Sequence, residues 1–583
     1  MNNLKEITLY EQLKFLWKSF NSRRKKQFYA LLVLMVFASL AEMIGIASVV
    51  PFFAALISPE QVYHHPYAQP FIKILEITDP QSLPLPLAIF FAIIILLAGI
   101  IRITLLYGIT RFSFALGSDL SVNIYRRTLY QDYSIHVNRN SSEVISAIIS
   151  KTNGVVGGVI SPILRFISSI IIFIGIVSVL INFSPVISMW VVASFGTIYI
   201  TIIYYSKPRI EKNSKIIANN STQMIKYLQE GLGGIRDIIM NHDQQFYCKK
   251  FTSADLLLRR AGGNNSFISQ SPRLVVEMLT MIIVSILAYV MLQQDGTTLS
   301  SGIPLLAAFA LGGQKLIPAI QQLYSSYSSV KGSRASLEDV LIMLDQPLPK
   351  SFDNKQLTVI PFEKEIRLTS LGFRHLRSKD WILKDINIVI EKGTCVGFVG
   401  VTGSGKSTLL DVIMGLLLAT EGELTIDKVK VTRNNLNEWQ SHIAHVPQNI
   451  YLSDGSVEEN IAFGIPVELI NFQKVKKAAK QALISDSIDQ WVDGYKTLVG
   501  EGGIRLSGGQ RQRIGIARAL YREADVLILD EATSALDDDT EESVMKSIYN
   551  FDKKLTILII AHRLKTLKGC DKIINLENES KNI

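Results

Sequence analysis

The 583-residue chain is too apolar for a series of soluble domains, because 48% of its residues are hydrophobic and only 19% are charged, against about 25% charged in ordinary soluble domains. Its mean hydropathy of +0.26 also excludes an intrinsically disordered chain. The net charge of +9 does not indicate a nucleic-acid partner, since the basic residues gather beside apolar runs as in a membrane protein.

The cysteines and the N-terminus give two further expectations. Cys248, Cys395 and Cys570 are odd in number, far apart in the sequence and without metal-ligand spacing, so no disulfide framework is predicted. The N-terminus lacks the basic, apolar and small-residue order of a secretory signal peptide. We therefore expect the first apolar run to stay in the mature protein.

The first periodic segment predicts an amphipathic helix lying on the membrane surface. Its apolar residues recur at helical spacing and are separated by lysines and a glutamate. They are Leu9, Leu13, Leu16, Trp17 and Phe20. A basic polar face beside an apolar face is typical of interfacial helices.

Six segments are long and apolar enough to cross a bilayer, because about 20 residues at ~1.5 Å each cover ~30 Å of hydrocarbon. They lie near residues 27–57, 84–112, 155–182, 186–206, 273–293 and 301–323. The segments around 113–154 and 207–272 hold most of the loop lysines and arginines. The positive-inside rule therefore places these segments and the N-terminus in the cytoplasm of an inner (plasma) membrane protein.

The two cytoplasmic segments are predicted to extend the spanning helices, because they keep helical periodicity, as at Leu228 and Leu232. On the opposite side, the loop around 66–76 carries Phe71, Ile74 and Leu75, which could line a short surface helix. A disordered loop is the alternative.

The composition changes after Leu344. Residues 1–345 form the predicted membrane domain, and residues 346–360 form a linker that begins with two prolines in three residues at 347–349. From 361 to 583 alternating strand and helix patterns predict a soluble α/β domain.

The first functional motif of this second domain is a phosphate-binding loop. Residues 394–399 predict a buried strand that runs into a G-x-x-x-x-G-K-S loop and then a helix. The loop comprises Gly400, Val401, Thr402, Gly403, Ser404, Gly405, Lys406, Ser407 and Thr408. In this setting backbone N–H groups and the helix N-terminus cradle phosphates. Lys406 is expected to reach the β- and γ-phosphates, and the Ser407 hydroxyl to bind Mg²⁺.

A second buried strand, 525–529, ends in Asp530 and Glu531. It places both carboxylates at the carboxyl edge of a parallel sheet, where ligands bind. Asp530 is expected to hold the metal, and Glu531 to act as the general base that accepts a proton from the attacking water. Without the phosphate loop the two would be an ordinary surface acid pair.

Between these strands the sequence L-S-G-G-Q at 506–510 precedes a predicted helix. With this segment the chain resembles the ATP-binding cassette (ABC) transporter family along essentially its whole length. The family implies an exporter-type α-helical membrane domain with six transmembrane helices, an α/β P-loop ABC nucleotide-binding domain, and ATP and Mg²⁺ as cofactors. It also implies that four signature residues bind nucleotide: Ser507, Gly508, Gly509 and Gln510.

Other motifs of the family follow in order. Gln448 resembles the glutamine that senses Mg²⁺ and couples to the membrane domain. Glu501 lies in a segment similar to an exporter-type coupling loop, and residues 534–537 resemble the loop that crosses the dimer interface. His562 resembles the histidine that contacts the γ-phosphate. The resemblance thus implies Glu531, His562 and Gln448 as catalytic residues, and Ser407, Gln448 and Asp530 as metal-binding residues.

One motif departs from the family pattern. Where the family usually has a tyrosine to stack on adenine, this chain has His375, whose imidazole is smaller and titrates near neutrality. Phe373 is expected to be a core strand residue rather than a replacement, and Trp381 is a candidate neighbour. Adenine recognition is therefore less well indicated than phosphate binding.

A single copy of each motif implies a homodimer, because in this family the phosphate loop of one subunit faces the signature of the other. The intact Glu531 and signature imply that both composite sites hydrolyse ATP. The exporter resemblance also implies coupling helices near residues 130–142 and 229–237.

Charged residues inside the spans are the clue to cargo, since charges in hydrocarbon face a cavity or one another. They are Glu42, Arg102, Arg165 and Lys315, with Arg273 at the start of the fifth span. At ~1.5 Å per residue Arg102 and Lys315 lie about 20–27 Å from the outer side, in the cytoplasmic half with Arg273. Arg102, Arg273 and Lys315, doubled in a dimer, predict a cationic belt for a phosphate or pyrophosphate group. The alternative is that each snorkels to the interface or pairs internally, as Arg102 with Glu42.

The first span, together with the segments around 272–273 and 315–318, is similar to the branch that flips polyprenyl-pyrophosphate-linked oligosaccharides. The resemblance implies movement from the cytoplasmic to the outer leaflet for protein glycosylation or surface glycan assembly. One alternative is an exporter of lipid A core, phospholipid, peptide or amphipathic drug. Another is a membrane-tethered nucleotide-dependent regulator that transports nothing, which the intact Glu531 and His562 disfavour.

Overall fold

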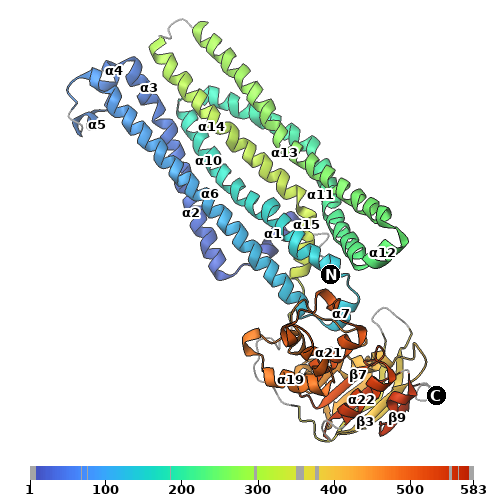
Figure 1. The fold of residues 1–583 in the computed structure, drawn as a ribbon. Coiled ribbons are helices and arrows are strands. Elements are labelled where there is room, and N and C mark those ends of the chain that lie inside the picture. Colours follow the sequence, from blue (N-terminus) through green and yellow to red (C-terminus); the bar gives the residue numbers. More distant parts are fainter. Residues whose placement is uncertain are drawn as a thin grey trace. The chain divides into compact units, whose positions relative to one another are not determined.

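The computed structural model describes residues 8–66, 68–74, 77–183, 185–293, 299–348, 360–374, 380–549, 554–561 and 563–576. The chain forms two units (Figure 1). The membrane unit comprises Met1–Gln131 and Arg139–Leu348, and the nucleotide unit comprises Asp132–Asn138 and Pro349–Ile583. Most of the predicted linker, residues 349–359, lies outside the described residues.

All regular secondary structure in the described residues of the membrane unit is helical (Figure 1). Its helices are α1 (Leu9–Lys18), α2 (Ser22–Ala47), α3 (Val49–Ile57), α4 (Pro59–Tyr63), α5 (Gln69–Ile74), η2 (Pro80–Ser82), α6 (Pro84–Leu129), α8 (Ser141–Ser146), η3 (Ala147–Lys151), α9 (Thr152–Val155), η4 (Val156–Ile160), α10 (Ser161–Phe183), α11 (Pro185–Gly233), α12 (Ile235–Asn241), α13 (Gln244–Gln293), α14 (Leu299–Gly332) and α15 (Arg334–Leu344).

The predicted spans all fall on these helices. Among the described residues, four stretches are long and apolar enough to cross a membrane: Ser22–Ile57, Pro80–Leu129, Ser141–Asn182 and Ser188–Gly233. The fifth and sixth predicted spans lie on α13 and α14, most of whose side chains between 280 and 311 lie outside the described set. The first span is broken at Ser48 because Pro51 has no N–H to donate to the carbonyl of Ala47.

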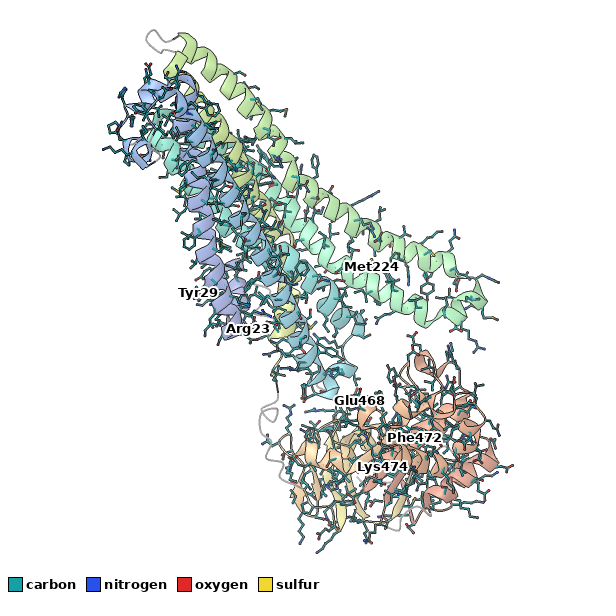
Figure 2. All side chains as sticks on the ribbon, turned by 60° about the vertical axis from the view of Figure 1, so that its left-hand side comes forward. Arg23, Tyr29, Met224, Glu468, Phe472 and Lys474 are labelled. Carbon is teal, nitrogen blue, oxygen red and sulfur yellow. The ribbon has the colours of Figure 1, made fainter. Side chains whose placement is uncertain are left out.

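The N-terminal helix forms as predicted but packs differently. Thr8 caps α1 in a capping box with Glu11, and Leu16 is buried. The apolar face of α1 joins a core cluster with residues of α2, α6 and α15. Its apolar residues therefore pack at least partly on protein, a contact that the sequence did not indicate, while its position at the membrane surface stays a prediction. Arg23 and Tyr29 lie near the start of the next helix, α2 (Figure 2).

The loop around 66–76 contains the short helix α5, so its helical interpretation is confirmed. Ile72 is the buried residue there, packed with Ala55 and Leu83. The sequence had pointed instead to Phe71, Ile74 and Leu75. Leu75 and the side chains of Phe71 and Ile74 lie outside what the structure describes.

The nucleotide unit contains two sheets. The first is antiparallel, in the order β2-β1-β4-β5, and the second is parallel, in the order β6-β7-β8-β3-β9. The strands are β1 (Glu365–Phe373), β2 (Leu383–Glu391), β3 (Cys395–Val399), β4 (Glu421–Ile426), β5 (Val429–Lys430), β6 (Ile443–Val446), β7 (Val526–Asp530), β8 (Thr556–Ile560) and β9 (Lys572–Asn575).

One helix of this unit, α7, comes from a short segment whose neighbours in the sequence belong to the membrane unit. The helices are α7 (Tyr133–Val137), α16 (Lys406–Ile413), α17 (Leu436–Ser441), α18 (Val457–Ile461), η6 (Val467–Leu469), α19 (Phe472–Gln481), α20 (Ser485–Asp489), η7 (Gly494–Lys496), η8 (Glu501–Gly503), α21 (Gly508–Tyr521), α22 (Asp538–Tyr549) and η9 (Leu564–Leu567). Glu468, Phe472 and Lys474 mark η6 and α19 in Figure 2. The parallel order aligns the carboxyl ends of β3 and β7 at one edge, where the predicted phosphate loop and acid pair both begin.

The parallel sheet also brings together two cysteines that are distant in the sequence. Cys395 opens β3 and Cys570 lies just before β9, which pairs with β3. Their Sγ atoms are 3.0 Å apart, and both thiols are free. Their separation in the sequence gave no sign of this contact, because it arises from the pairing of β3 with β9.

Candidate nucleotide-binding site

The phosphate loop joins the end of β3 to the first turn of α16. Gly403 and Gly405 both have φ of 88°, a left-handed conformation that favours glycine. A Cβ at Gly405 would lie 2.9 Å from Leu383 Cδ2 and 3.1 Å from the Ile382 carbonyl oxygen. The loop can therefore follow this path only with glycine at this position.

Lys406 and Ser404 place an ammonium and a hydroxyl group inside the phosphate loop. Lys406 is buried, and its Nζ donates to the carbonyl oxygens of Gly400 at 2.8 Å and Val401 at 3.0 Å. The Ser404 hydroxyl is buried without a hydrogen-bond partner among the described residues. An ammonium and an unpaired hydroxyl enclosed by a glycine-rich loop fit the phosphates of a nucleotide. Thr402 and Ser407 are exposed and Thr408 is half-buried.

The acid pair ends β7 as predicted. Asp530 is the last residue of the strand and pairs in register with Ile560 of β8. Glu531 has φ of 50°, and its N–H donates to the Ile560 carbonyl at 3.0 Å. Gln448 Nε2 donates to Glu531 Oε2 at 2.6 Å. The structure thus joins two of the three predicted catalytic residues in a direct hydrogen bond.

A third carboxylate near this edge was missed by sequence reasoning. Burial, reinforced by the charge of Asp530, raises the pKa of Asp411 from its ordinary value of 3.8 to about 6. Asp411 lies four residues after Ser407 on α16, and residues four apart share a helix face. That spacing was the available signal. Ser407 and Asp530 supply the hydroxyl and carboxylate oxygens that suit Mg²⁺, and Asp411 adds a carboxyl group whose charge interacts with that of Asp530.

The signature segment forms the N-terminus of α21. Ser507 Oγ accepts from the Gln510 N–H at 3.2 Å, and the Ser507 N–H donates to Gln510 Oε1 at 2.9 Å. The Gln510 side chain is therefore engaged in a capping box, a structural role beside the nucleotide contact expected for it. A Cβ at Gly508 would lie 3.3 Å from Ala535 Cβ, and one at Gly509 would lie 3.2 Å from Leu536 Cδ2. These glycines let α21 approach the 534–537 loop closely.

Two predicted histidines lie outside the described residues: His375, expected at the adenine, and His562, expected at the γ-phosphate. Phe373 is buried in the core beside β2, as expected of a strand residue. Trp381 has the guanidinium of Arg374 at 4.7 Å from its ring, so a cation already occupies one face of this candidate neighbour.

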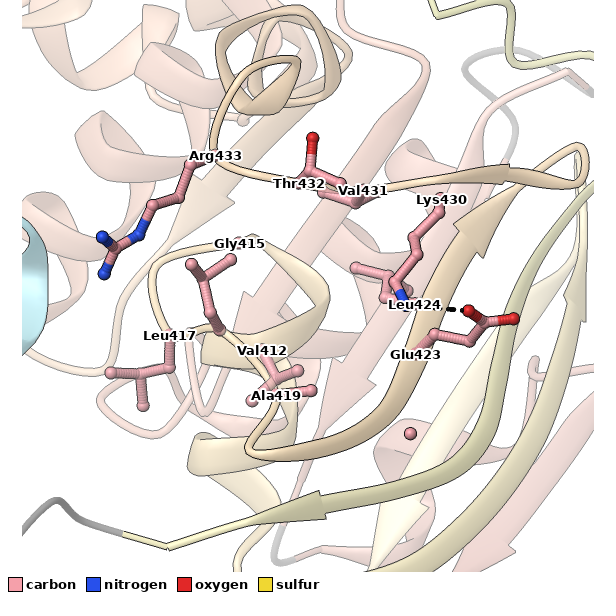
Figure 3. A pocket seen from close by; sticks show the side chains of 12 residues that line it. Val412, Gly415, Leu417, Ala419, Glu423, Leu424, Lys430, Val431, Thr432 and Arg433 are labelled. Atoms are coloured by element: carbon pink, nitrogen blue, oxygen red, sulfur yellow. Dashed lines mark ion pairs between the residues drawn. The ribbon is translucent and has the colours of Figure 1, made fainter. Parts of the chain in front are cut away.

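The segment Asp132–Asn138 belongs to the nucleotide unit and contains α7, within the predicted coupling region 130–142. Arg433 Nη2 donates to Asp132 Oδ2 at 2.8 Å. Arg433 also lines a cavity of about 270 Å³ between the end of α16 and the β4–β5 hairpin (Figure 3). No motif marked Arg433, because its partner is 301 residues away. The second predicted region, 229–237, overlaps α12, which begins later at Ile235.

In the membrane unit, two predicted substrate residues converge on one acid. Arg102 Nη1 lies 3.4 Å from Glu42 Oε1, and Lys315 Nζ lies 3.1 Å from Glu42 Oε2. The side chains of Arg102 and Lys315 are 60% and 45% exposed, whereas that of Glu42 is 10% exposed. The structure therefore contains the internal Arg102–Glu42 pair that the sequence left as an alternative, with Lys315 added to it.

The two remaining cations pair elsewhere. Arg273 Nε lies 2.7 Å from Glu277 Oε1, one turn along α13. Arg165 donates to Ser161 Oγ at 2.7 Å, one turn back on α10. Arg273 therefore does not share the acid that joins Arg102 and Lys315.

Comparison with known proteins agrees with both units. Residues 29–312 match the family model of the ABC transporter transmembrane region, and residues 383–534 match that of the ABC transporter. An ATP-dependent lipid A-core flippase of Legionella pneumophila (strain Paris) is 30% identical over 477 residues, covering 78% of this chain and 77% of that protein. One from Francisella tularensis subsp. tularensis (strain SCHU S4 / Schu 4) is 29% identical over 471 residues, covering 78% and 74%.

A solved structure extends the similarity in fold to nearly the whole chain. The structure of a bacterial Atm1-family ABC exporter with ATP bound has a TM-score of 0.75 and 20% sequence identity, covering 95% of this chain and 94% of that one. With a P-loop sheet, a signature helix and a helical membrane unit on one polypeptide, the chain belongs to the ABC transporter family, as an exporter-type transporter whose ATPase domain drives transport.

Proposed function

We propose that the protein is an ATP-driven flippase that moves a polyprenyl-pyrophosphate-linked oligosaccharide from the cytoplasmic to the outer leaflet, for protein glycosylation or surface glycan assembly. It works as a homodimer in the inner membrane, with the nucleotide units in the cytoplasm. Its cofactors are ATP and Mg²⁺. Each ATP lies between the phosphate loop of one protomer and the signature segment of its partner.

The observation that carries the cargo proposal is the charge at Glu42. Two cations from different helices, Arg102 of α6 and Lys315 of α14, share this one carboxylate of α2. The cluster at Glu42 therefore keeps one positive charge per protomer that its single carboxylate does not compensate. Such a charge is costly in hydrocarbon and indicates a binding site for an anion. A pyrophosphate suits it, because cations bind phosphate oxygens through strong charge-assisted hydrogen bonds.

The nucleotide unit supplies the free energy for transport by binding and hydrolysing ATP. Lys406 binds the β- and γ-phosphates, while Ser407 and Asp530 hold Mg²⁺, which when bound neutralises charge on the phosphates. Gln448 orients the Glu531 carboxylate through the 2.6 Å hydrogen bond. Glu531 then accepts a proton from the water that attacks the γ-phosphate. His562 is expected to donate to the γ-phosphate from the same protomer.

Coupling between the units runs through α7. The Asp132–Arg433 ion pair holds this segment against the nucleotide unit. ATP binds the closed pair of nucleotide units more tightly than the open pair. It therefore shifts the membrane units from inward-facing to outward-facing.

A lipid A core is the second candidate cargo, because the two relatives named above are ATP-dependent lipid A-core flippases. Both cargoes are large amphiphiles. An exporter of peptide or amphipathic drug would not need the positive charge at Glu42, whereas the phosphate of a phospholipid would also suit it.

The test is transport in proteoliposomes. The intact protein and a Glu531→Gln variant are compared for ATP-dependent movement of a fluorescent polyprenyl-pyrophosphate-linked oligosaccharide, with labelled lipid A core in a parallel arm. Movement of the oligosaccharide lipid by the intact protein alone supports the proposal. Movement of lipid A core alone, or of neither lipid despite ATP hydrolysis, contradicts it.

Single substitutions connect the result to the charge. Arg102→Ala and Lys315→Ala should each lower transport about tenfold, as expected for loss of a charge-assisted contact, with basal ATP hydrolysis unchanged. Arg165→Ala is the matched control, since it removes a spanning arginine that pairs with Ser161 instead of Glu42. Equal transport by all three variants would remove the support that the Glu42 site gives.

A further inference from the structure

The membrane unit contains a second polar site, a half-open cavity of about 360 Å³ lined by four helical segments. They run from η3 to η4, along α11, along α13, and from the end of α14 into α15. In Figures 1 and 2, α11 and α13 run side by side along one edge of this unit, where Met224 marks α11. The cavity lies between this pair and the segments of η3–η4 and α14–α15.

The lining of this cavity is polar and nearly neutral. It consists of eight serines, four glycines, one asparagine, one lysine and one isoleucine. The only charged lining residue is Lys151, whose Nζ lies 2.6 Å from Asp339 Oδ2. Because that charge is compensated and only Ile217 is apolar, the lining suits neither a free anion nor a lipid tail. A dense set of hydroxyls suits an uncharged ligand that itself carries many hydroxyls.

Two of the hydroxyls point to a ligand. Ser328 and Ser336 are only 2% and 7% exposed and line the cavity. No hydrogen bond joins either hydroxyl to another of the described residues. Because the two hydroxyls line the cavity and have no protein partner, their hydrogen bonds are made to what the cavity holds, water or a ligand.

The cavity lies where the head group of the proposed cargo would extend. Its segments adjoin the cytoplasmic ends of the third to sixth predicted spans. Ser328, the lining residue of α14 nearest in sequence to Lys315, follows it by thirteen residues, a rise of about 20 Å. The Glu42 site is thus on the membrane side of the cavity, and the hydroxyls are on the water side. This is the order of pyrophosphate and sugars in a lipid-linked glycan entering from the cytoplasm.

We propose that this hydroxyl-lined cavity binds sugar units farther along the glycan from the pyrophosphate, an inference that rests on the proposed flippase function. Its volume is near the lower end of the ~300–1,000 Å³ of small-molecule pockets, so it takes part of the glycan and not the whole chain. Sugar hydroxyls supply the partners that Ser328 and Ser336 lack. The cavity thereby selects glycolipids over sugarless polyprenyl pyrophosphate.

Two adjacent glycines of α13 provide a matched test. A Cβ at Gly262 or at Gly263 meets nothing within 4 Å, so both positions accept a side chain. Gly262 lines the cavity, whereas Gly263 is exposed outside it. Gly262→Leu should fill the cavity and lower ATP-dependent movement of the polyprenyl-pyrophosphate-linked oligosaccharide about tenfold. Movement of polyprenyl pyrophosphate without sugars, and basal ATP hydrolysis, should be unchanged. Gly263→Leu should resemble the intact protein.

A second pair of variants keeps the test decisive if Gly262→Leu fails to fold. Ser328→Ala combined with Ser336→Ala removes hydroxyls that have no internal partner, so a loss of transport cannot come from a broken internal hydrogen bond. Ser326→Ala is the control, because Ser326 is equally buried on α14, outside the cavity, and accepts from Gln322. A several-fold loss confined to the double variant and to the sugar-bearing lipid is expected.

The outcomes separate the two proposals. If the intact protein moves neither polyprenyl lipid, both the flippase function and the sugar site are wrong. If it moves the glycolipid but cavity and control variants behave alike, only the sugar site is wrong. An equal loss with both lipids in the cavity variants would also overturn the sugar site, because it would show damage to transport in general.

Discussion

The nucleotide site and the Glu42 site both bind charge, but they are built in opposite ways. In the nucleotide unit, Lys406 is buried and held by two carbonyl oxygens of its own loop, within six residues of sequence. In the membrane unit, Lys315 reaches Glu42 across 273 residues, and its side chain is 45% exposed. The first site is a local backbone structure, and the second is an assembly of separate helices.

This difference in construction determines which function each site is suited to. Loop backbone at a sheet edge is rigid, so it can hold phosphates in the precise geometry that catalysis requires. Side chains that meet between helices can separate when the helices move. A charge cluster of this kind is therefore suited to bind and release cargo during a transport cycle.

The largest expected effect is a loss of ATP hydrolysis, caused by a substitution that leaves the phosphate-binding loop intact. Glu531→Gln should lower ATP hydrolysis by about 10²–10⁴-fold, the usual contribution of a general base, because the amide cannot accept the proton. ATP binding, measured with a fluorescent analogue, should be retained. Near-normal hydrolysis by this variant would mean that another group is the base.

The next expected effect tests the assembled site. Glu42→Gln removes the carboxylate that joins Arg102 and Lys315, leaving two uncompensated cations per protomer. Because these cations then attract an anionic head group more strongly, the KM for the pyrophosphate-linked lipid should fall. Release should slow and lower the maximal transport rate several-fold, with basal ATP hydrolysis unchanged. A rise in KM would contradict a role of these cations in binding cargo.

A pH experiment should affect the nucleotide unit selectively. Burial lowers the pKa of His445, on β6 beside β7, from its ordinary value of 6.5 to about 4. A lowered pKa means that the unfolded chain takes up the proton first, so stability is lost as pH falls from 6.5 toward 4. At pH 5.5 the loss should be about 1 kcal/mol.

The matched variant for that experiment is His445→Gln, which cannot titrate. Thermal unfolding of the nucleotide unit should depend less on pH between 6.5 and 4 in this variant than in the intact protein. Identical pH profiles would show that protonation of His445 does not destabilise the fold.

The smallest expected effect concerns the link at α7. Exposed ion pairs contribute only about 0.2–1 kcal/mol, and the side chains of Arg433 and Asp132 are 71% and 49% exposed. Asp132→Arg should therefore lower transport per ATP hydrolysed only a few-fold. Adding Arg433→Asp should restore it, because the reversed pair can form again. Failure of the double variant to recover would show that the pair does not carry the coupling.

The sequence by itself determined the features that depend on neighbouring residues. The lengths of the apolar runs predicted the six spanning helices. The glycine-rich loop, the acid pair after β7 and the signature segment predicted the nucleotide site, because each is a continuous stretch whose backbone conformation is set by its own residues. The capping box of Ser507 and Gln510 is of the same local kind, although the sequence had suggested a ligand role for Gln510.

Tertiary structure alone decided the features that join distant parts of the chain. Long-range packing selected Lys315 as a second partner of Glu42, brought Asp411 within electrostatic reach of Asp530, and brought Arg433 to Asp132. It also packed α1 on the protein core and formed the serine-lined cavity. Apart from the helical spacing of Ser407 and Asp411, none of these has a sequence signature. Side chains on separate helices and strands meet only once the elements pack, and periodicity predicts which face is apolar without specifying its partner.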